Sequence, residues 1–127
     1  MFFKFNTYTI VWASCMFALN WGRLESLPTT QIFYFLYFDK IAHFSQFCLF
    51  AFLMLVGLRK QHSYPYLKFN AYQVTLIFTL GFAFLLEGIH YFRANIYFEF
   101  WDLIADCLGG VLGIFIFYLI YKKIHEN

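Results

Sequence analysis

Four apolar segments of similar length set the strongest limit on how this chain can fold. They span about residues 5–21, 39–58, 71–90 and 102–121, and each is close to the ~20 residues that a helix needs to cross a bilayer. Hydrophobic residues make up 62% of the chain, more apolar surface than a soluble domain of 127 residues can bury. The sequence therefore predicts an all-α membrane protein, a four-transmembrane-helix bundle that forms a single domain over residues 1–127.

The first of these segments is the most polar. It carries Asn6, Thr7, Thr9, Ser14 and Asn20. A signal peptide is the alternative, but one lysine makes a weak basic region and no small-residue cleavage site follows. We therefore expect a spanning helix here as well.

The positions of the charged residues predict an orientation. Six basic residues lie at one set of segment ends: Lys4, Arg59, Lys60, Lys68, Lys122 and Lys123. Three lie at the opposite ends, namely Arg23, Lys40 and Arg93, together with every acidic residue except Glu126. Because cytoplasmic loops carry the excess of Lys and Arg in membrane proteins, we expect both termini in the cytoplasm and the acidic ends outside.

Polar residues recur at helical spacing near the acidic ends of three segments. Residues three and four apart share one face of a helix, so the second, third and fourth segments each carry a polar strip. An ionisable group at that depth costs a few kcal/mol unless it is paired or wetted, which makes a functional site the first hypothesis. We predict one ligand-binding cluster from these strips: Asp39, Lys40, His43, Gln46, Glu87, His90, Arg93, Asp102 and Asp106. For Asp39, a role as a helix cap is the alternative.

A row of small residues continues the strip on the fourth segment. Ala105, Gly109 and Gly113 follow each other at intervals of four, and such rows let helix backbones approach closely in lipid. This row predicts a packing seam that presses Asp102 and Asp106 against a neighbouring helix.

Two short stretches share the pattern aromatic-Asp-x-Ile-Ala, "FDKIAHF" at 38–44 and "WDLIADC" at 101–107. Each opens the second helix of a predicted hairpin, which indicates a parallel repeat about an axis normal to the membrane. In such a repeat, His43 and Asp106 occupy equivalent places near the axis.

Taken together, three motifs resemble the VanZ-like family of small bacterial membrane proteins. They are "DKIAHFSQF", then E-x-x-H-Y-F, then D-x-x-A-D-x-x-G-x-x-x-G, over about residues 38–116. Three positions depart from the family pattern: His90 replaces the usual Gln, Asp106 replaces the usual Asn, and Ile96 stands where the family has an Arg that Arg93 would have to replace. The resemblance implies a multi-pass protein of the bacterial cell (inner) membrane with an envelope role, since the founding relative lowers susceptibility to teicoplanin.

The first functional hypothesis is ligand binding without turnover. The outward polar site would hold a lipid-linked or amphiphilic ligand, such as a membrane lipid, an envelope precursor or a lipoglycopeptide. Lys40 and Arg93 would meet a phosphate or carboxylate, and the aromatic segments 31–38 and 96–101 would contact the acyl part. Nucleic acid is not expected as a partner because no basic face exists, and no resident cofactor is expected.

The alternative hypothesis is a membrane metalloprotein or an enzyme acting on a lipid headgroup. Glu87-x-x-His90 matches the Glu-x-x-His signature of metal sites in helical bundles, and His43 and Asp106 would complete the ligand set. A transporter ranks last, because the basic half of the chain offers no matching buried charge and four short helices would need to form oligomers.

Overall fold

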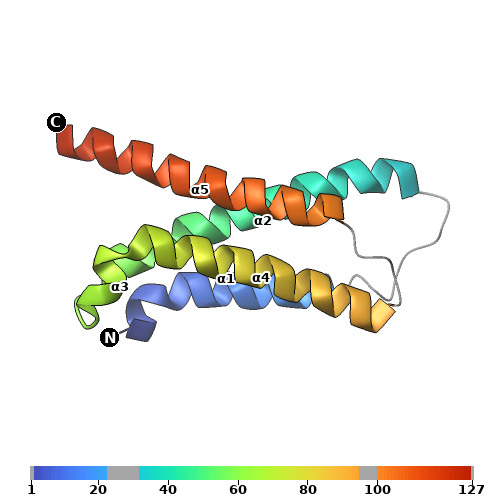
Figure 1. The fold of residues 1–127 in the computed structure, drawn as a ribbon, viewed down its shortest axis with the longest axis horizontal. Coiled ribbons are helices and arrows are strands. Elements are labelled where there is room, and N and C mark those ends of the chain that lie inside the picture. Colours follow the sequence, from blue (N-terminus) through green and yellow to red (C-terminus); the bar gives the residue numbers. More distant parts are fainter. Residues whose placement is uncertain (1, 23–31, 95–99, 127) are drawn as a thin grey trace.

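The computed structural model describes residues 2–22, 32–94 and 100–126, and the secondary structure in these ranges is helical. The helices are α1 (Phe2–Gly22), α2 (Ile32–Lys60), α3 (Pro65–Phe69), α4 (Ala71–Ala94) and α5 (Phe100–Glu126). The long helices run side by side, with α3 and both termini at one end of the bundle (Figure 1). The predicted all-α architecture is confirmed.

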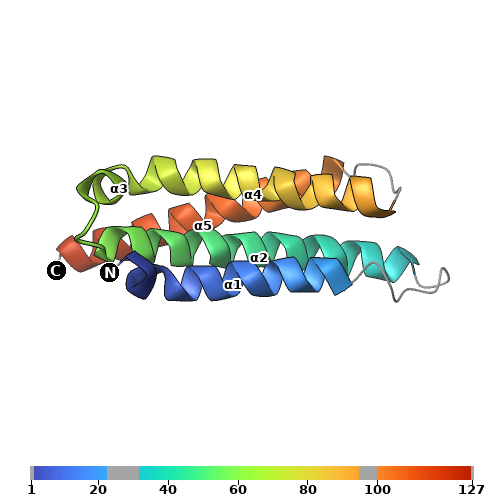
Figure 2. The same ribbon diagram turned by 90° about the horizontal axis from the view of Figure 1, so that it is seen from below.

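The prediction of four transmembrane helices is wrong. Within the described residues, three helices are long and apolar enough to cross a membrane: Lys40–Lys60, Ala71–Phe92 and Phe100–Lys122. The first helix has 21 residues, but Asn, Thr and Ser side chains lower its hydropathy too far. α1 nevertheless packs against α2, which runs in nearly the same direction in the view of Figure 2.

Two helix boundaries also differ from the expectation. α2 begins at Ile32 rather than near residue 39, because no Gly or Pro interrupts the aromatic stretch that precedes Asp39. That stretch therefore continues the helix. In the segment between α2 and α4, Pro65 starts the short helix α3. Pro is tolerated in the first turn of a helix because the N–H that it lacks would have no partner within the helix.

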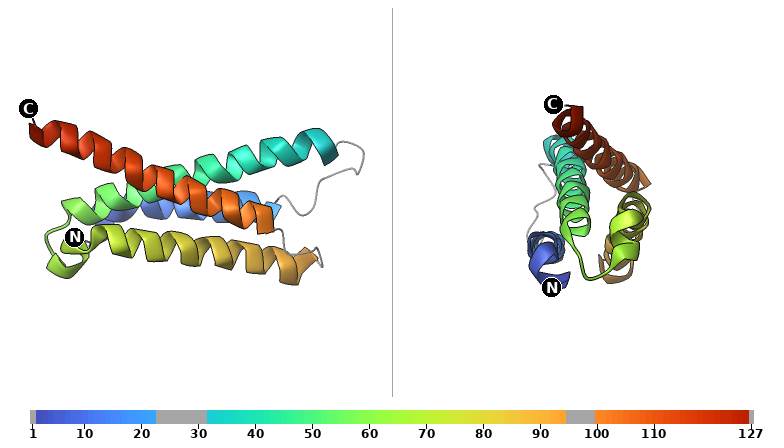
Figure 3. Two further views of the ribbon diagram at one scale, coloured as in Figure 1. Left: turned by 45° about the horizontal axis from the view of Figure 1, so that its top comes forward. Right: turned by 90° about the vertical axis from the view of Figure 1, so that its left-hand side faces the viewer.

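The closest helix pair is α2 with α5, which cross each other (Figure 3). A Cβ atom added at Gly109 would collide with the backbone carbonyl of Phe44, and one at Gly113 would collide with that of Cys48. Only glycine allows the two backbones to approach this closely. Gly109 and Gly113 therefore lie where α5 packs closely against α2.

The other helices pack around α2 with larger side chains. Phe47 and Phe50 of α2 contact Phe82 of α4 through their rings. On α1, the indole Nε1–H of Trp12 donates a 3.0 Å hydrogen bond to the backbone carbonyl of Gln46. α2 thus contacts each of the other helices.

Candidate functional site

Three helices bring their polar strips to the same end of the bundle. α4 ends there and α5 begins there, while α2 passes through that level within its first turns (Figure 1). The described cations at the opposite end are Lys4, Arg59, Lys60, Lys68 and Lys122. We call these the acidic end and the basic end.

The most deeply buried pair of the site joins α2 to α5. Nδ1 of His43 lies 3.0 Å from Oδ1 of Asp106, and the two side chains are 3% and 2% exposed. The glycine seam explains this contact, because Asp106 sits one turn before Gly109 and is carried toward α2 with it. The hydrogen bond orients the imidazole and assigns Nδ1 to the carboxylate.

A second cross-helix pair lies one turn further toward the acidic end. Nζ of Lys40 donates to Oδ1 of Asp102 at 2.9 Å. Asp102 is buried, whereas the lysine side chain is 32% exposed. The two pairs form consecutive rungs between the same helices, because 40 and 43 share a face of α2 and 102 and 106 share a face of α5.

The third helix adds Glu87 and His90. Oε2 of Glu87 lies 3.8 Å from Nδ1 of His90, which is too long for a hydrogen bond and is an ion pair only when the histidine is protonated. Glu87 is buried and interacts electrostatically with Asp106. The α4 strip thus lies close to the innermost pair of the other two helices.

Other predicted site residues are placed differently. Gln46 is partly buried, and its side-chain oxygen has no hydrogen-bond partner among the described residues. The side chains of Asp39 and Arg93 lie outside the described residues, so their membership of the site stays a prediction. Ala105 lies one turn before Gly109 and is partly buried.

The metal alternative has no geometric support in the described part of the chain. Among those residues, no group of three His, Cys, Asp or Glu side chains is arranged to hold a metal ion. The site offers pairs instead. A buried His–carboxylate pair can hold or share a proton and can present hydrogen bonds to a ligand.

The sequence reasoning missed a continuation of the α4 strip. Thr75 and Thr79 are buried and lie on the same face as Glu87, at intervals of four residues through Ala83. Thr79 packs against Gly110 of α5. The spacing alone identifies this row, which extends the helix contact away from the site.

The comparisons with known proteins assign the family. The model of the VanZ/LLP1 family matches residues 2–121, so the match includes α1, which the motifs did not cover. No curated protein and no solved structure matches the chain. With three helices of transmembrane length, the protein has the character of a multi-pass membrane protein. The chain belongs to the VanZ-like family.

Proposed function

We propose that this protein lies in the bacterial cell (inner) membrane and binds a lipid-linked or amphiphilic envelope ligand at its acidic end. The binding would lower susceptibility to glycopeptides of the teicoplanin type. Membership of the VanZ-like family supports the envelope role, and the geometry of the polar site supports the binding.

The observation that carries the proposal is the buried pair of His43 and Asp106, 3.0 Å apart. A helix seam in lipid needs only small apolar residues to pack. An ionisable pair in that position costs desolvation, and apolar residues of similar volume often replace such a pair without loss of stability. Its presence beside Glu87 therefore favours a binding site over a purely structural contact.

The charge distribution supports an orientation with both termini in the cytoplasm. The described cations cluster at the end that carries both termini. Because the basic end of a membrane protein faces the cytoplasm, the acidic end would face outward, where envelope precursors and glycopeptides are found.

The surroundings of the site suit a ligand that is polar at one end and apolar at the other. Carboxylates, imidazoles and Lys40 supply hydrogen bonds and charge. Phe92, Phe100 and Trp101 are exposed at the same end of the bundle, and aromatic side chains favour the membrane interface. They would contact the apolar part of the ligand while the polar part reaches the paired residues.

The test is glycopeptide susceptibility in a sensitive Gram-positive host. Wild type should raise the inhibitory concentration of teicoplanin more than that of vancomycin. Glu87→Gln should abolish this protection at equal membrane abundance, because it removes the charge beside the innermost pair. Gln73→Ala, an exposed change near the other end of α4, is the matched control and should leave the protection intact.

Two outcomes would contradict the proposal. One is a well-expressed wild type that gives no protection against teicoplanin. The other is equal protection by wild type and Glu87→Gln, which would separate the resistance from the polar site.

A further inference from the structure

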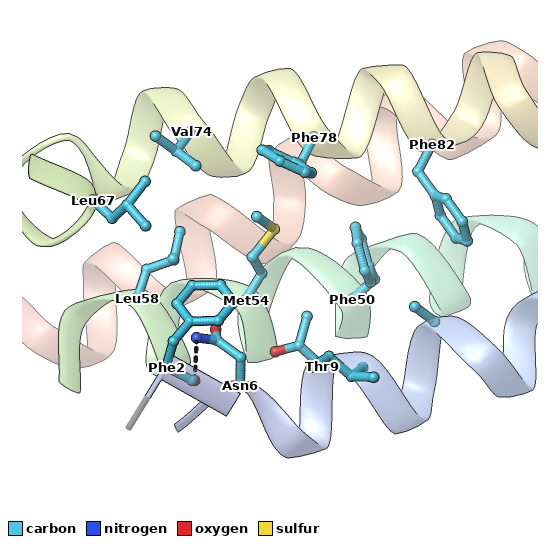
Figure 4. Close-up of a pocket in the computed structure, with 12 residues that line it drawn as sticks. Phe2, Asn6, Thr9, Phe50, Met54, Leu58, Leu67, Val74, Phe78 and Phe82 are labelled. Atoms are coloured by element: carbon cyan, nitrogen blue, oxygen red, sulfur yellow. Dashed lines mark hydrogen bonds between the residues drawn. The ribbon is translucent and has the colours of Figure 1, made fainter. Parts of the chain in front are cut away.

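A second feature of the bundle, away from the polar site, is an apolar pocket of about 340 Å³. α1 and α4 lie apart from each other in the end-on view (Figure 3), and α2 contacts both. The pocket lies between them and is lined mainly by Phe, Leu, Ile, Val and Met side chains (Figure 4). Ile10 of α1 and Phe78 of α4 line it and are exposed, so it reaches the lipid-facing surface. Its volume falls in the range of ligand pockets.

One polar group in this lining has no partner. Thr9 is 8% exposed, and its hydroxyl forms no hydrogen bond in the described structure. Other hydroxyls on α1 bond to their own helix: Thr7 donates to the carbonyl of Phe3 at 2.7 Å, and Ser14 to that of Ile10 at 2.9 Å. Thr9 instead lies between α1 and the side chains of Phe50 and Met54 (Figure 4). A buried donor of this kind favours a ligand that carries an acceptor.

The depth of Thr9 suits an ester group. It lies seven residues after Phe2, about 10 Å along a helix that rises 1.5 Å per residue. The headgroup regions of a bilayer add roughly 5–7 Å on each side of the hydrocarbon core. If the first turn of α1 projects about 3–5 Å beyond the headgroup layer, the hydroxyl lies at the inner boundary of that layer, where the ester carbonyls are.

Cations surround the basic end of the pocket. On three of the lining helices, the lining residue nearest this end is followed by a basic residue. Phe2 precedes Lys4, Leu58 precedes Arg59 and Lys60, and Leu67 precedes Lys68. In the described helices, Glu126 at the last residue of α5 is the one acidic residue at this end, against several cations. The charge therefore complements an anionic headgroup placed above an apolar cavity.

We propose that the pocket holds an acyl chain of an anionic phospholipid from the leaflet at the basic end of the bundle. The headgroup lies near Lys68, and an ester carbonyl of the lipid accepts a hydrogen bond from Thr9. This resident lipid fills the space that α1 and α4 leave beside α2. The site is separate from the polar site and does not depend on the glycopeptide function.

Native mass spectrometry tests this proposal on the full chain. The protein is reconstituted with equal amounts of phosphatidylglycerol and phosphatidylcholine that carry the same acyl chains, and the bound lipid is counted after release. Wild type should retain one phosphatidylglycerol in preference to phosphatidylcholine. Ala13→Phe and Val74→Phe fill the pocket from opposite walls and should each reduce the retained lipid about tenfold, a change of ~1.4 kcal/mol.

Two further variants separate the headgroup from the chain. Lys68→Gln should weaken the preference for phosphatidylglycerol about fivefold, the effect of one cation near an anionic surface. Thr9→Val keeps the shape of the side chain and should lower retention of both lipids about fivefold, the effect of one hydrogen bond of ~1 kcal/mol. Lys122→Gln on α5 is the charge control and should leave the preference unchanged.

Val111→Phe, exposed on α5 and outside the pocket, is the matched control for the filling variants. The proposal is overturned if Ala13→Phe and Val74→Phe, each folded by circular dichroism, retain as much phosphatidylglycerol as Val111→Phe. It is also overturned by equal retention of the two lipids, or by a lipid-free dimer, which would mean that a second copy of the chain occupies the pocket.

Discussion

The two ends of the bundle hold their charges in opposite ways. At the acidic end, Glu87, Asp102 and Asp106 are each at most 5% exposed, and their described partners are Lys40, His43 and His90. At the basic end, Lys4, Lys60 and Lys122 are exposed. Surface cations suit contact with lipid headgroups and set the orientation of the protein in the membrane. Enclosed and paired groups suit the recognition of a ligand.

The difference follows from how closely the helices approach. On the α2–α5 side, Gly109 and Gly113 let the backbones meet, so side chains next to that seam are forced into contact and out of solvent. On the α1–α4 side, Phe and Met side chains hold the helices apart and leave a cavity of about 340 Å³. One side of the bundle thus encloses polar pairs, and the other encloses apolar space.

The largest effect is expected from a change that forces α5 away from α2. Gly109→Leu would place a side chain against the Phe44 carbonyl and push α5 away from α2, which should lower the free energy of unfolding by about 3 kcal/mol. Unfolding in detergent micelles, followed by circular dichroism, measures it. Gly81→Leu is the control because a Cβ there has no neighbour within 4 Å. Equal effects of the two changes would show that the seam does not set the helix distance.

Breaking the innermost pair should come next. Asp106→Leu removes the carboxylate that contacts Nδ1 of the buried His43 and should lower the free energy of unfolding by about 2–3 kcal/mol. Asp106→Asn keeps an oxygen that accepts from Nδ1, so it should cost no more than about 1 kcal/mol. The same denaturation measurement compares them. A leucine variant as stable as the asparagine variant would argue that the pair contributes nothing to the fold.

A change at the contact between α1 and α2 tests what holds α1 on the more loosely packed side of the bundle. Trp12→Phe removes the 3.0 Å hydrogen bond to the Gln46 carbonyl and should lower the free energy of unfolding by about 1 kcal/mol. Trp101→Phe, at an exposed position on α5, is the control for the loss of an indole. No difference between the two variants would mean that apolar packing alone holds α1.

The smallest effect is expected at the outer rung of the site. Lys40→Met removes a pair whose lysine side chain is 32% exposed, and exposed pairs contribute less than about 1 kcal/mol because solvent screens them. High salt should reduce the difference between this variant and wild type. A loss as large as that of Asp106→Leu would show that the two rungs are equally enclosed, against the structure.

Much of the site could be read from spacing alone. Intervals of three and four residues placed His43, Glu87 and Asp106 on inward faces, and the structure buries all three. The pattern shared by residues 38–44 and 101–107 put His43 and Asp106 at equivalent places, and Nδ1 of His43 lies 3.0 Å from Oδ1 of Asp106. The parallel repeat itself stays a prediction. Partners could not be predicted in this way, because spacing along one helix does not say which side chain of another helix lies opposite. The pairing of Asp102 with Lys40 comes from the structure.

The sequence by itself determined the helical class, the family and the acidic and basic ends, since these depend on local apolarity, helical period and the order of charges along the chain. It predicted a spanning helix at α1 despite the Asn, Thr and Ser residues of that segment, and in the described part of the chain α1 is not among the helices apolar enough to cross a membrane. The tertiary structure decided which polar groups pair and where the bundle leaves a pocket. Both depend on the distance between helix axes, which is set by side chains from several helices at once and cannot be read from the residues of any one helix.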